Sequence, residues 1–328
     1  MKVLILGGAG MVGRKLAERL ARDGRLGNAE ITGLTLYDVV APQKPAGAKF
    51  PVETLTGDLP AVGETDKLVA SQPDVIFHLA AIVSGEAEQE FEKGYRINLQ
   101  GTMNLLESIR TAYDGAPRKP RLVFTSSIAV FGAPFPEKIP DEFFTTPLTS
   151  YGTQKAIGEL LIADYTRKGM LDGVGIRLPT ICVRPGKPNK AASGFFSNII
   201  REPLAGHEAV LPVSDDVMHW HASPRAAIGF LQHAATIDGA RLGARRNLSM
   251  PGLAVTVGQQ IEALRKVAGE KVVARIKRVP DPFVQEIVAG WPRNFETRRS
   301  IELGFKAETS FEEIIRVHID DELGGKVA

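Results

Sequence analysis

Cysteine is almost absent from this chain of 328 residues, since it occurs once, at Cys182. A single cysteine excludes an internal disulfide framework and is typical of proteins that work in the reducing cytoplasm. Cys182 stands between Ile181 and Val183. We therefore expect a small buried apolar side chain at this position rather than a nucleophile.

An excess of charge of one sign is also missing. The 40 Lys and Arg residues nearly balance the 38 Asp and Glu residues, which leaves a formal net charge of +2. The chain therefore has no large excess of positive charge with which to bind nucleic acid, and we predict no nucleic-acid partner. The apolar run at residues 3–6 is too short to span a membrane. It opens the first predicted strand instead, so we predict a cytoplasmic protein with no membrane partner.

A complete set of metal ligands is lacking as well. His219 and His221 flank Trp220, but no cysteine or third histidine stands close to them. Zinc sites need three or four protein ligands. We predict no metal, and we expect these histidines to line a turn or cleft.

The chain does contain a glycine-rich turn between a predicted strand at 2–6 and a predicted helix at 14–22. Gly7 permits a tight turn, Gly10 lets the backbone approach a pyrophosphate, and Gly13 lets the helix pack closely on the strand. The N-terminus of the helix then offers unpaired N–H groups to an anion, and Met11 and Val12 join the expected cofactor contacts.

Asp38 closes the predicted second strand, residues 31–38. A carboxylate in this position accepts both hydroxyls of the adenosine ribose and repels a 2′-phosphate. The next basic residue is Lys44, so nothing beside Asp38 would neutralise that phosphate. NAD is therefore predicted in preference to NADP.

Strands and helices alternate along the first half of the chain. Further strands are expected at 52–56, 75–79, 122–125 and 175–178, and helices at about 65–71, 88–112 and 150–168. Such alternation predicts an α/β fold with a doubly wound parallel sheet. We expect an NAD-binding Rossmann domain over 1–178, with return segments near 222–250, and a smaller C-terminal, mainly substrate-binding domain over 179–328.

Ligands of such sheets bind beyond the carboxyl ends of the strands. Asp58 and Leu59 follow the third strand, and Leu79, Ala80 and Ala81 follow the fourth. We predict that these residues contact the adenine and the backbone of the cofactor.

A tyrosine and a lysine, Tyr151 and Lys155, stand four residues apart in a predicted helix and so share one face. An ammonium group beside a phenol lowers the pKa of the phenol from its reference value of about 10, which makes a general base. Upstream, the strand at 122–125 ends in Ser126 and Ser127, which present hydroxyl groups.

Together these motifs resemble the extended short-chain dehydrogenase/reductase superfamily, also called the NAD-dependent epimerase/dehydratase superfamily. The resemblance covers nearly the whole chain. It rests on motifs in the family's order and spacing: Gly7 to Gly13, Gly57-Asp58-Leu59, His78 to Ala81, Asn98 to Thr102, Ser126 to Gly132 and Tyr151 to Lys155.

The resemblance implies Tyr151 as catalytic base and Lys155 as the residue that holds the nicotinamide ribose and tunes Tyr151. It implies a serine that polarises the reacting oxygen: Ser127 by position, with Ser126 an adjacent candidate. Asn98 would support the helix near the cofactor, and Pro179 would join the cofactor contacts.

The substrate is expected to be a small hydroxy acid. Ile128-Ala129 replace the Asp-Glu pair that dehydratases of this group carry, which counts against dehydration. The basic segment 177–189 and the segments 200–206 and 151–161 resemble those of the D-erythronate dehydrogenase family, which oxidises C2 of a four-carbon sugar acid. Arg184 and Lys187 would then meet the carboxylate, and Ser84 a substrate hydroxyl; Ser126 is a further candidate for substrate contact.

Other functions stay open at this point. A nucleotide-sugar 4-epimerase would retain NAD and release no NADH, a non-catalytic NAD-sensing regulator would have no need of Ser127, Tyr151 and Lys155, and other alcohols remain as substrates. By analogy with the superfamily we expect a homodimer formed by the helices at 88–112 and 150–168, through apolar residues such as Leu106, Leu160 and Ile162.

Overall fold

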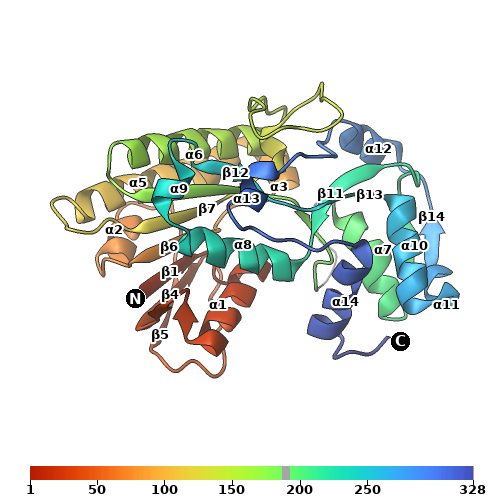
Figure 1. Ribbon diagram of the computed structural model, residues 1–328, viewed down its shortest axis with the longest axis horizontal. Coiled ribbons are helices and arrows are strands. Elements are labelled where there is room, and N and C mark those ends of the chain that lie inside the picture. Colours follow the sequence, from red (N-terminus) through yellow and green to blue (C-terminus); the bar gives the residue numbers. More distant parts are fainter. Residues whose placement is uncertain (187–192, 328) are drawn as a thin grey trace. The chain divides into compact units, whose positions relative to one another are not determined.

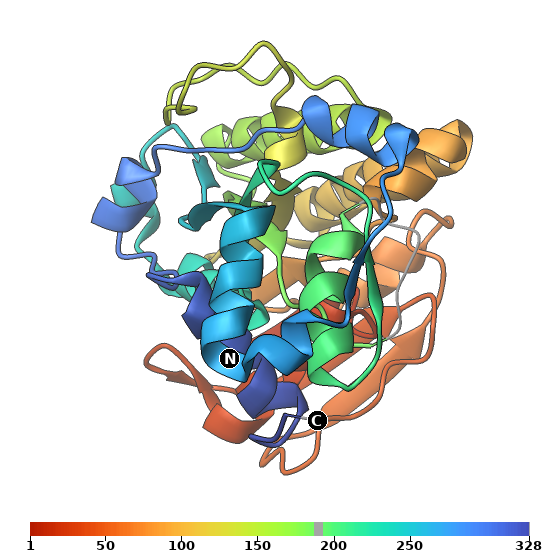
Figure 2. The same ribbon diagram turned by 90° about the vertical axis from the view of Figure 1, so that its right-hand side faces the viewer.

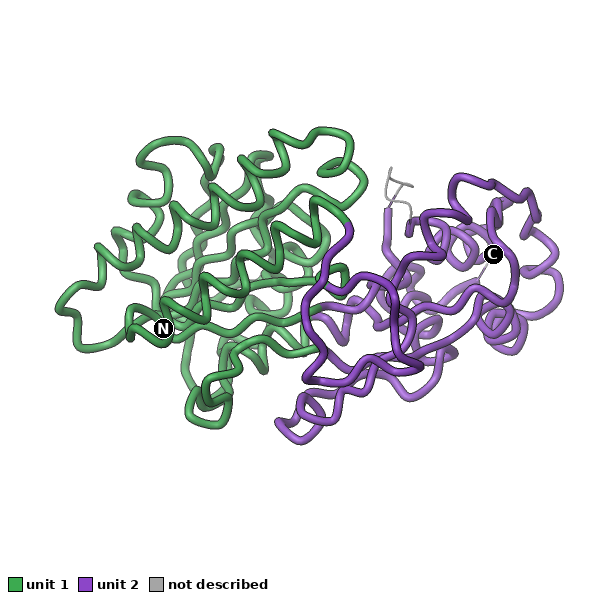
Figure 3. The backbone as a smooth tube through the Cα atoms, turned by 90° about the horizontal axis from the view of Figure 1, so that it is seen from above, with its two compact units in different colours: residues 1–130, 149–177, 228–249 green, residues 131–148, 178–227, 250–328 purple. Residues whose placement is uncertain are grey.

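The computed structural model describes residues 1–186 and 193–327. The chain divides into two compact units, which are shown in different colours in Figure 3. Unit 1 contains residues 1–130, 149–177 and 228–249, and unit 2 contains residues 131–148, 178–227 and 250–328. The segment 131–148 thus belongs to unit 2, although it interrupts the stretch that the sequence assigned to the first domain.

Unit 1 is built on a parallel sheet in which seven strands of the described residues take part. From one edge to the other these are β12 (Asn247–Ser249), β8 (Asp172–Leu178), β7 (Arg121–Ser127), β6 (Val75–His78), β1 (Lys2–Leu6), β4 (Gly33–Asp38) and β5 (Val52–Thr56). The order reverses between β1 and β6, as in Rossmann folds. The predicted fold class is therefore confirmed.

Helices cover both faces of this sheet. The main ones are α1 (Met11–Asp23), α2 (Glu64–Val69), α5 (Gly101–Ala112), α6 (Ser150–Arg167) and α8 (Pro224–Thr236). Figure 1 shows α5 and α6 on one face and α1 and α8 on the other. The central strands β1 and β6 are apolar runs with buried side chains, because a parallel sheet covered on both faces exposes neither side to water.

The predicted helix at 88–112 is in fact broken. Its place is taken by α3 (Ser84–Gln89), α4 (Phe91–Gly94), a π-helical stretch η1 (Tyr95–Gln100) and α5. Leu106 and Ile162, which we expected to contribute to a dimer interface, are fully buried in the core of unit 1. That part of the expectation was wrong, because these two side chains face the sheet; Leu160 is 68% exposed.

Short elements complete unit 1. They are the hairpin of β2 (Arg25–Leu26) and β3 (Ala29–Glu30), the 3-10 turn η2 (Ile128–Val130) and α9 (Gly239–Leu242). Among the described residues of the whole chain, we find no helix that combines the length and the apolar character needed to cross a membrane.

Unit 2 holds two small sheets, one of β9 (Thr180–Ile181), β11 (Met218–Ala222) and β13 (Leu253–Thr256), the other of β10 (Ala209–Leu211) and β14 (Ile276–Arg278). Its helices are α7 (Gly194–Leu204), α10 (Val257–Ala268), α11 (Glu270–Val273), α12 (Pro282–Ala289), α13 (Arg298–Glu302) and α14 (Phe311–Glu322). α10 contacts α7, α11 and α14, and Figure 2 shows α7 and α10 side by side.

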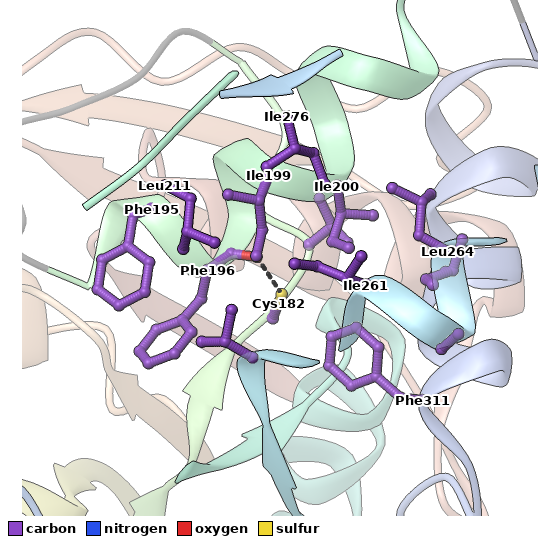
Figure 4. Close-up of a cluster of buried hydrophobic side chains, with 14 of the residues drawn as sticks. Cys182, Phe195, Phe196, Ile199, Ile200, Leu211, Ile261, Leu264, Ile276 and Phe311 are labelled. Carbon is purple, nitrogen blue, oxygen red and sulfur yellow. Dashed lines mark hydrogen bonds between the residues drawn. The ribbon is translucent and has the colours of Figure 1, made fainter. Parts of the chain in front are cut away.

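The core of unit 2 surrounds the single cysteine (Figure 4). Cys182 is free and fully buried, and its thiol contacts the carbonyl oxygen of Phe196 at 3.4 Å. Burial raises the pKa of the thiol to about 12. Because a thiol with so high a pKa holds its proton at neutral pH, it is a poor nucleophile, and the prediction of a buried apolar residue is confirmed.

Candidate active site

The glycine turn lies where the strand order of the sheet reverses. Gly7 follows β1 with a φ of 92°, a left-handed conformation that favours glycine. A Cβ at this position would come within 2.8 Å of the backbone nitrogen of Ala80, which follows β6. A side chain at Gly7 would therefore collide with the backbone that follows β6. This is the crevice in which Rossmann folds bind dinucleotides.

The N-terminus of α1 is open to an anion. A Cβ on Gly13 would overlap the carbonyl oxygen of Gly7, so the helix starts in close contact with the turn. Gly10 is the N-cap, no side chain of the described residues caps the helix there, and its first turn carries no acidic residue. The N–H groups of this turn, Met11 and Val12 included, are available for a pyrophosphate. These residues fit NAD.

Two carboxylates follow the neighbouring strands. Asp38, half-buried at the end of β4, accepts a hydrogen bond at Oδ2 from the Ala9 N–H at 2.9 Å. This bond holds Asp38 beside the glycine turn, where a carboxylate suits the ribose hydroxyls of NAD. Asp58, after β5, pairs with Arg96 at 2.6 Å, and the adjoining Leu59 is buried.

Asn98 holds the loop that carries Leu79, Ala80 and Ala81. Its Oδ1 accepts a hydrogen bond from the Ile82 N–H at 2.9 Å, and its Nδ2 donates to Oε1 of Gln154 at 2.7 Å. Gln154 lies on α6, next to Lys155. Asn98 lies in the π-helical stretch η1, a distortion that is frequent at functional sites. It thus connects the loop after β6 with α6.

The helix α6 brings Lys155 against the end of β7. Lys155 is 3% exposed, and its Nζ donates to the carbonyl oxygen of Thr125 at 2.8 Å. The same atom lies 4.8 Å from the centre of the Phe124 ring and 5.6 Å from that of Tyr151. Glycine allows this closeness, since a Cβ on Gly158 would come within 2.8 Å of the Phe124 ring.

Burial shapes the charge of Lys155. Loss of hydration lowers its pKa from the usual 10.5 to about 8, and the carboxylate of Glu159 opposes this effect. The ammonium group is therefore charged at neutral pH but close to its titration range. A cation of this kind next to Tyr151 stabilises a phenolate.

The two serines at the end of β7 lie in different surroundings, because neighbouring residues of a strand point to opposite faces. Ser126 is 3% exposed, and its hydroxyl donates to Oε1 of Glu159 at 2.5 Å. Ser127 is half-buried, and its Oγ accepts a hydrogen bond from the Ala129 N–H at 3.1 Å. The hydroxyl hydrogen of Ser126 is thus engaged within the unit.

Two buried charges, Glu159 and Arg177, were not predicted from the sequence to have a role in the site. Glu159 is 2% exposed and Arg177 8%, and they form a bidentate ion pair with distances of 2.9 and 2.7 Å. The signal in the sequence was the spacing: Tyr151, Lys155 and Glu159 follow one another at intervals of four and so share a helix face.

The remaining candidates for cofactor and substrate contact are spread over the chain. Ser84 is the first residue of α3 in unit 1. In unit 2, Pro179 is buried just before β9, and the guanidinium group of Arg184 donates to Ile181 O at 3.0 Å and Ser193 Oγ at 2.8 Å. Lys187 lies outside the described residues.

His219 and His221 are buried in strand β11 of unit 2 and so do not lie in a turn. His219 shares a hydrogen bond of 2.7 Å with Thr180, and His221 one of 2.8 Å with Gln260. Burial lowers the pKa of His219 to about 3, so its ring is neutral. The part of the chain that the structure describes contains no cluster of three or more His, Cys, Asp or Glu side chains able to hold a metal.

The chain is similar to known proteins over nearly its whole length. Residues 3–221 match the family described as "NAD dependent epimerase/dehydratase family". A Cupriavidus necator protein named D-erythronate dehydrogenase is 46% identical over 98% of this chain and 98% of its own length. A Haemophilus influenzae protein of the same name is 42% identical over 98% of this chain and 99% of its own length.

Solved structures agree on the fold. A structure described as a nucleoside-diphosphate-sugar epimerase from Agrobacterium tumefaciens is 64% identical, with a TM-score of 0.98, and the match covers 100% of this chain and 96% of that one. An L-threonine dehydrogenase from Cupriavidus necator is 23% identical with a TM-score of 0.84, and the match covers 98% of this chain and 99% of that one.

Proposed function

The chain belongs to the NAD-dependent epimerase/dehydratase family, and we propose that it oxidises D-erythronate to 2-dehydro-D-erythronate. The observation that carries the proposal is the full-length identity of 46% and 42% to two proteins named D-erythronate dehydrogenase from different organisms. The buried Lys155 beside Tyr151 supports it, because an alcohol dehydrogenase needs a base that works near neutral pH.

We propose that Tyr151 takes the proton of the C2 hydroxyl group while the charged Lys155 stabilises the resulting phenolate. Ser127 would orient the same hydroxyl oxygen. Its Oγ accepts a hydrogen bond from Ala129, and a hydroxyl group that accepts one bond can still donate its hydrogen to the substrate oxygen. NAD, when bound, supplies the acceptor for the C2 hydride, and the alcohol thereby becomes a ketone.

Residues of the glycine turn and of the loop after β6 would hold NAD, with Asp38 on the ribose and Asp58 and Leu59 near the adenine. Asn98 and Pro179 complete the cofactor contacts that we propose.

For the substrate carboxylate we propose Arg184, whose guanidinium group is held by Ile181 and Ser193. A fixed guanidinium loses less freedom on binding a carboxylate. Lys187 would add a second cation and Ser84 a contact to a hydroxyl group. Arg184→Ala should raise KM for the acid and leave KM for NAD unchanged; an unchanged KM for the acid would refute this role.

A second candidate function is nucleotide-sugar epimerisation, because the 64% identical Agrobacterium tumefaciens protein is described as a nucleoside-diphosphate-sugar epimerase. An epimerase returns the hydride to its substrate and releases no net NADH. A dehydrogenase forms one NADH for each alcohol that it oxidises. Net NADH formation therefore separates the two functions.

The test is to follow NADH absorbance with purified protein, NAD and each of D-erythronate, L-threonate, D-threonate, L-threonine and UDP-glucose. NADH formation that depends on D-erythronate would support the proposal. If none of the acids gives NADH and UDP-glucose is converted to UDP-galactose, the epimerase function replaces the proposal.

We also propose a cytoplasmic homodimer. The free, buried Cys182 suits a reducing compartment. Exposed apolar side chains on and near α5 and α6, namely Phe91 at 58%, Met103 at 40% and Leu160 at 68%, provide surface for a second copy. A monomer by light scattering would refute the dimer.

A further inference from the structure

The buried face of α6 carries a line of polar side chains. Tyr151, Lys155 and Glu159 succeed one another at intervals of four residues and so lie one above the other on the helix. Lys155 and Glu159 are 3% and 2% exposed. Charged side chains are rarely buried this completely unless they are paired. The buried carboxylate of Glu159 therefore needs an explanation as much as the buried ammonium group of Lys155.

Glu159 is fixed from several directions. Its Oε1 accepts hydrogen bonds from Ser126 Oγ at 2.5 Å and Arg177 Nε at 2.9 Å, and its Oε2 accepts one from Arg177 Nη2 at 2.7 Å. Its backbone oxygen accepts one from the Asn247 side chain at 3.2 Å. A bidentate arginine fixes the plane of a carboxylate as well as its position, so Glu159 has one orientation.

Several charged or titratable groups surround Lys155. On its own helix it faces Tyr151 and Glu159. The carboxylate of Glu159 raises the pKa of Lys155 against the lowering effect of burial. From β6 it faces His78, which is neutral because burial lowers its pKa to about 3. Arg177 on β8 pairs with the carboxylate of Glu159. That carboxylate is the anion that favours a charged Lys155.

We propose that Glu159 is a positioning residue for catalysis: it keeps Lys155 in the charged form, and Ser126 and Arg177 hold its carboxylate in place. This inference rests on the proposed function, since Lys155 affects the rate only if Tyr151 is the base. Ser126 then acts through Glu159, whereas Ser127 contacts the substrate. Without the carboxylate, Lys155 would lose its proton at a lower pH, and the phenolate of Tyr151 would lose its cation there.

The experiment is the pH profile of kcat/KM for D-erythronate at saturating NAD, recorded for the wild type, Glu159→Gln and Glu159→Asp. Asp172→Asn is the matched control, because it removes a carboxylate of the same unit that pairs with Arg121 and Arg246. We expect the alkaline limb of Glu159→Gln to move to lower pH by about one unit. Glu159→Asp should restore most of this shift, and Asp172→Asn should leave the limb unmoved.

A uniform loss of kcat/KM at every pH in Glu159→Gln, with an unmoved alkaline limb, would overturn the inference and leave Glu159 a purely structural role. If Glu159→Gln does not fold because Arg177 is left unpaired, the double variant Glu159→Gln/Arg177→Gln, which removes both partners of the ion pair, decides the question. An alkaline limb that moves to lower pH supports the inference, and an unmoved limb contradicts it.

A direct titration separates this inference from the proposed function. The side-chain signal of Lys155 is followed by NMR in lysine-labelled protein and is assigned by its loss in Lys155→Met. A lower Lys155 pKa in Glu159→Gln supports the role of Glu159 even if D-erythronate proves not to be the substrate. An unchanged pKa refutes it even if D-erythronate dehydrogenase activity is found.

Discussion

Replacement of Lys155 by methionine should make the protein without NAD more stable at neutral pH and abolish turnover. Burial lowers the pKa of Lys155 from 10.5 to about 8. The charged form is therefore about 3 kcal/mol less favourable in the folded protein than in the unfolded chain. Methionine fills similar space and carries no charge. A functional side chain of this kind is retained at the expense of stability.

The expected gain is smaller than this cost. The substitution also removes the hydrogen bond of 2.8 Å from Lys155 to the Thr125 carbonyl, which is worth about 1–2 kcal/mol. A net gain of about 1–2 kcal/mol in the free energy of unfolding remains. For a chain of 328 residues, this corresponds to a rise of about 2 °C in Tm.

The pH dependence gives the sharper test. Between about pH 8 and pH 10.5 the unfolded chain keeps a proton on Lys155 that the folded protein has released. Wild-type stability therefore rises with pH through this window relative to Lys155→Met. The variant should be more stable at pH 7, and the order should reverse between about pH 8 and pH 10.5. Above this window only the lost hydrogen bond distinguishes the two proteins.

Calorimetric Tm values of the two proteins, compared at each pH, would show this crossing. Lys67→Met is the control, since the Lys67 side chain is 74% exposed and its loss should give no crossing. A Lys155→Met protein that is less stable at pH 7, or a difference in Tm that stays constant with pH, would refute the reasoning.

Further predictions concern the base and the cofactor site. Tyr151→Phe should lower kcat by about 10²–10⁴-fold, measured as NADH formation, while calorimetric titration still detects NAD binding. Asp38→Asn should weaken NAD binding by about tenfold and reduce the preference over NADP, because the carboxylate that accepts the ribose hydroxyls and repels a 2′-phosphate is lost. Gly13→Ala should destabilise the protein by at least about 2 kcal/mol, measured by urea unfolding, because the added Cβ would overlap the Gly7 carbonyl.

Each of these has a defined contrary result. Substantial turnover in Tyr151→Phe would remove Tyr151 from the role of base. An unchanged affinity for NAD in Asp38→Asn would place the ribose elsewhere. Gly229→Ala is the control for Gly13→Ala, since a Cβ at Gly229 meets no atom within 4 Å; equal effects of the two substitutions would contradict the steric argument.

Several features were readable from the sequence because they depend on residues close together in the chain. The glycine turn can be recognised because its backbone conformation requires glycine, and Asp38 because it stands at the end of a predicted strand. The apolar runs of β1 and β6 could be recognised as central strands, and with them the fold class. The spacing of Tyr151 and Lys155 follows from the helix period alone.

The packing of the helices could not be read in the same way. A single helix was predicted for 88–112, but the chain contains the π-helical stretch η1, in which Asn98 bonds to both Ile82 and Gln154. The assignment of Leu106 and Ile162 to an outer surface failed because both helices have apolar residues on more than one face. Which face meets the sheet is decided by packing.

By itself, the sequence determined a doubly wound fold, a preference for NAD and a Tyr-Lys pair, because each is encoded by spacing along one or two elements. Only the tertiary structure decided how the buried charges are partnered. Ser126, Glu159 and Arg177 come from β7, α6 and β8, separated by 33 and 18 residues. A hydrogen bond between such positions exists only where packing brings the elements together, and no local pattern records it.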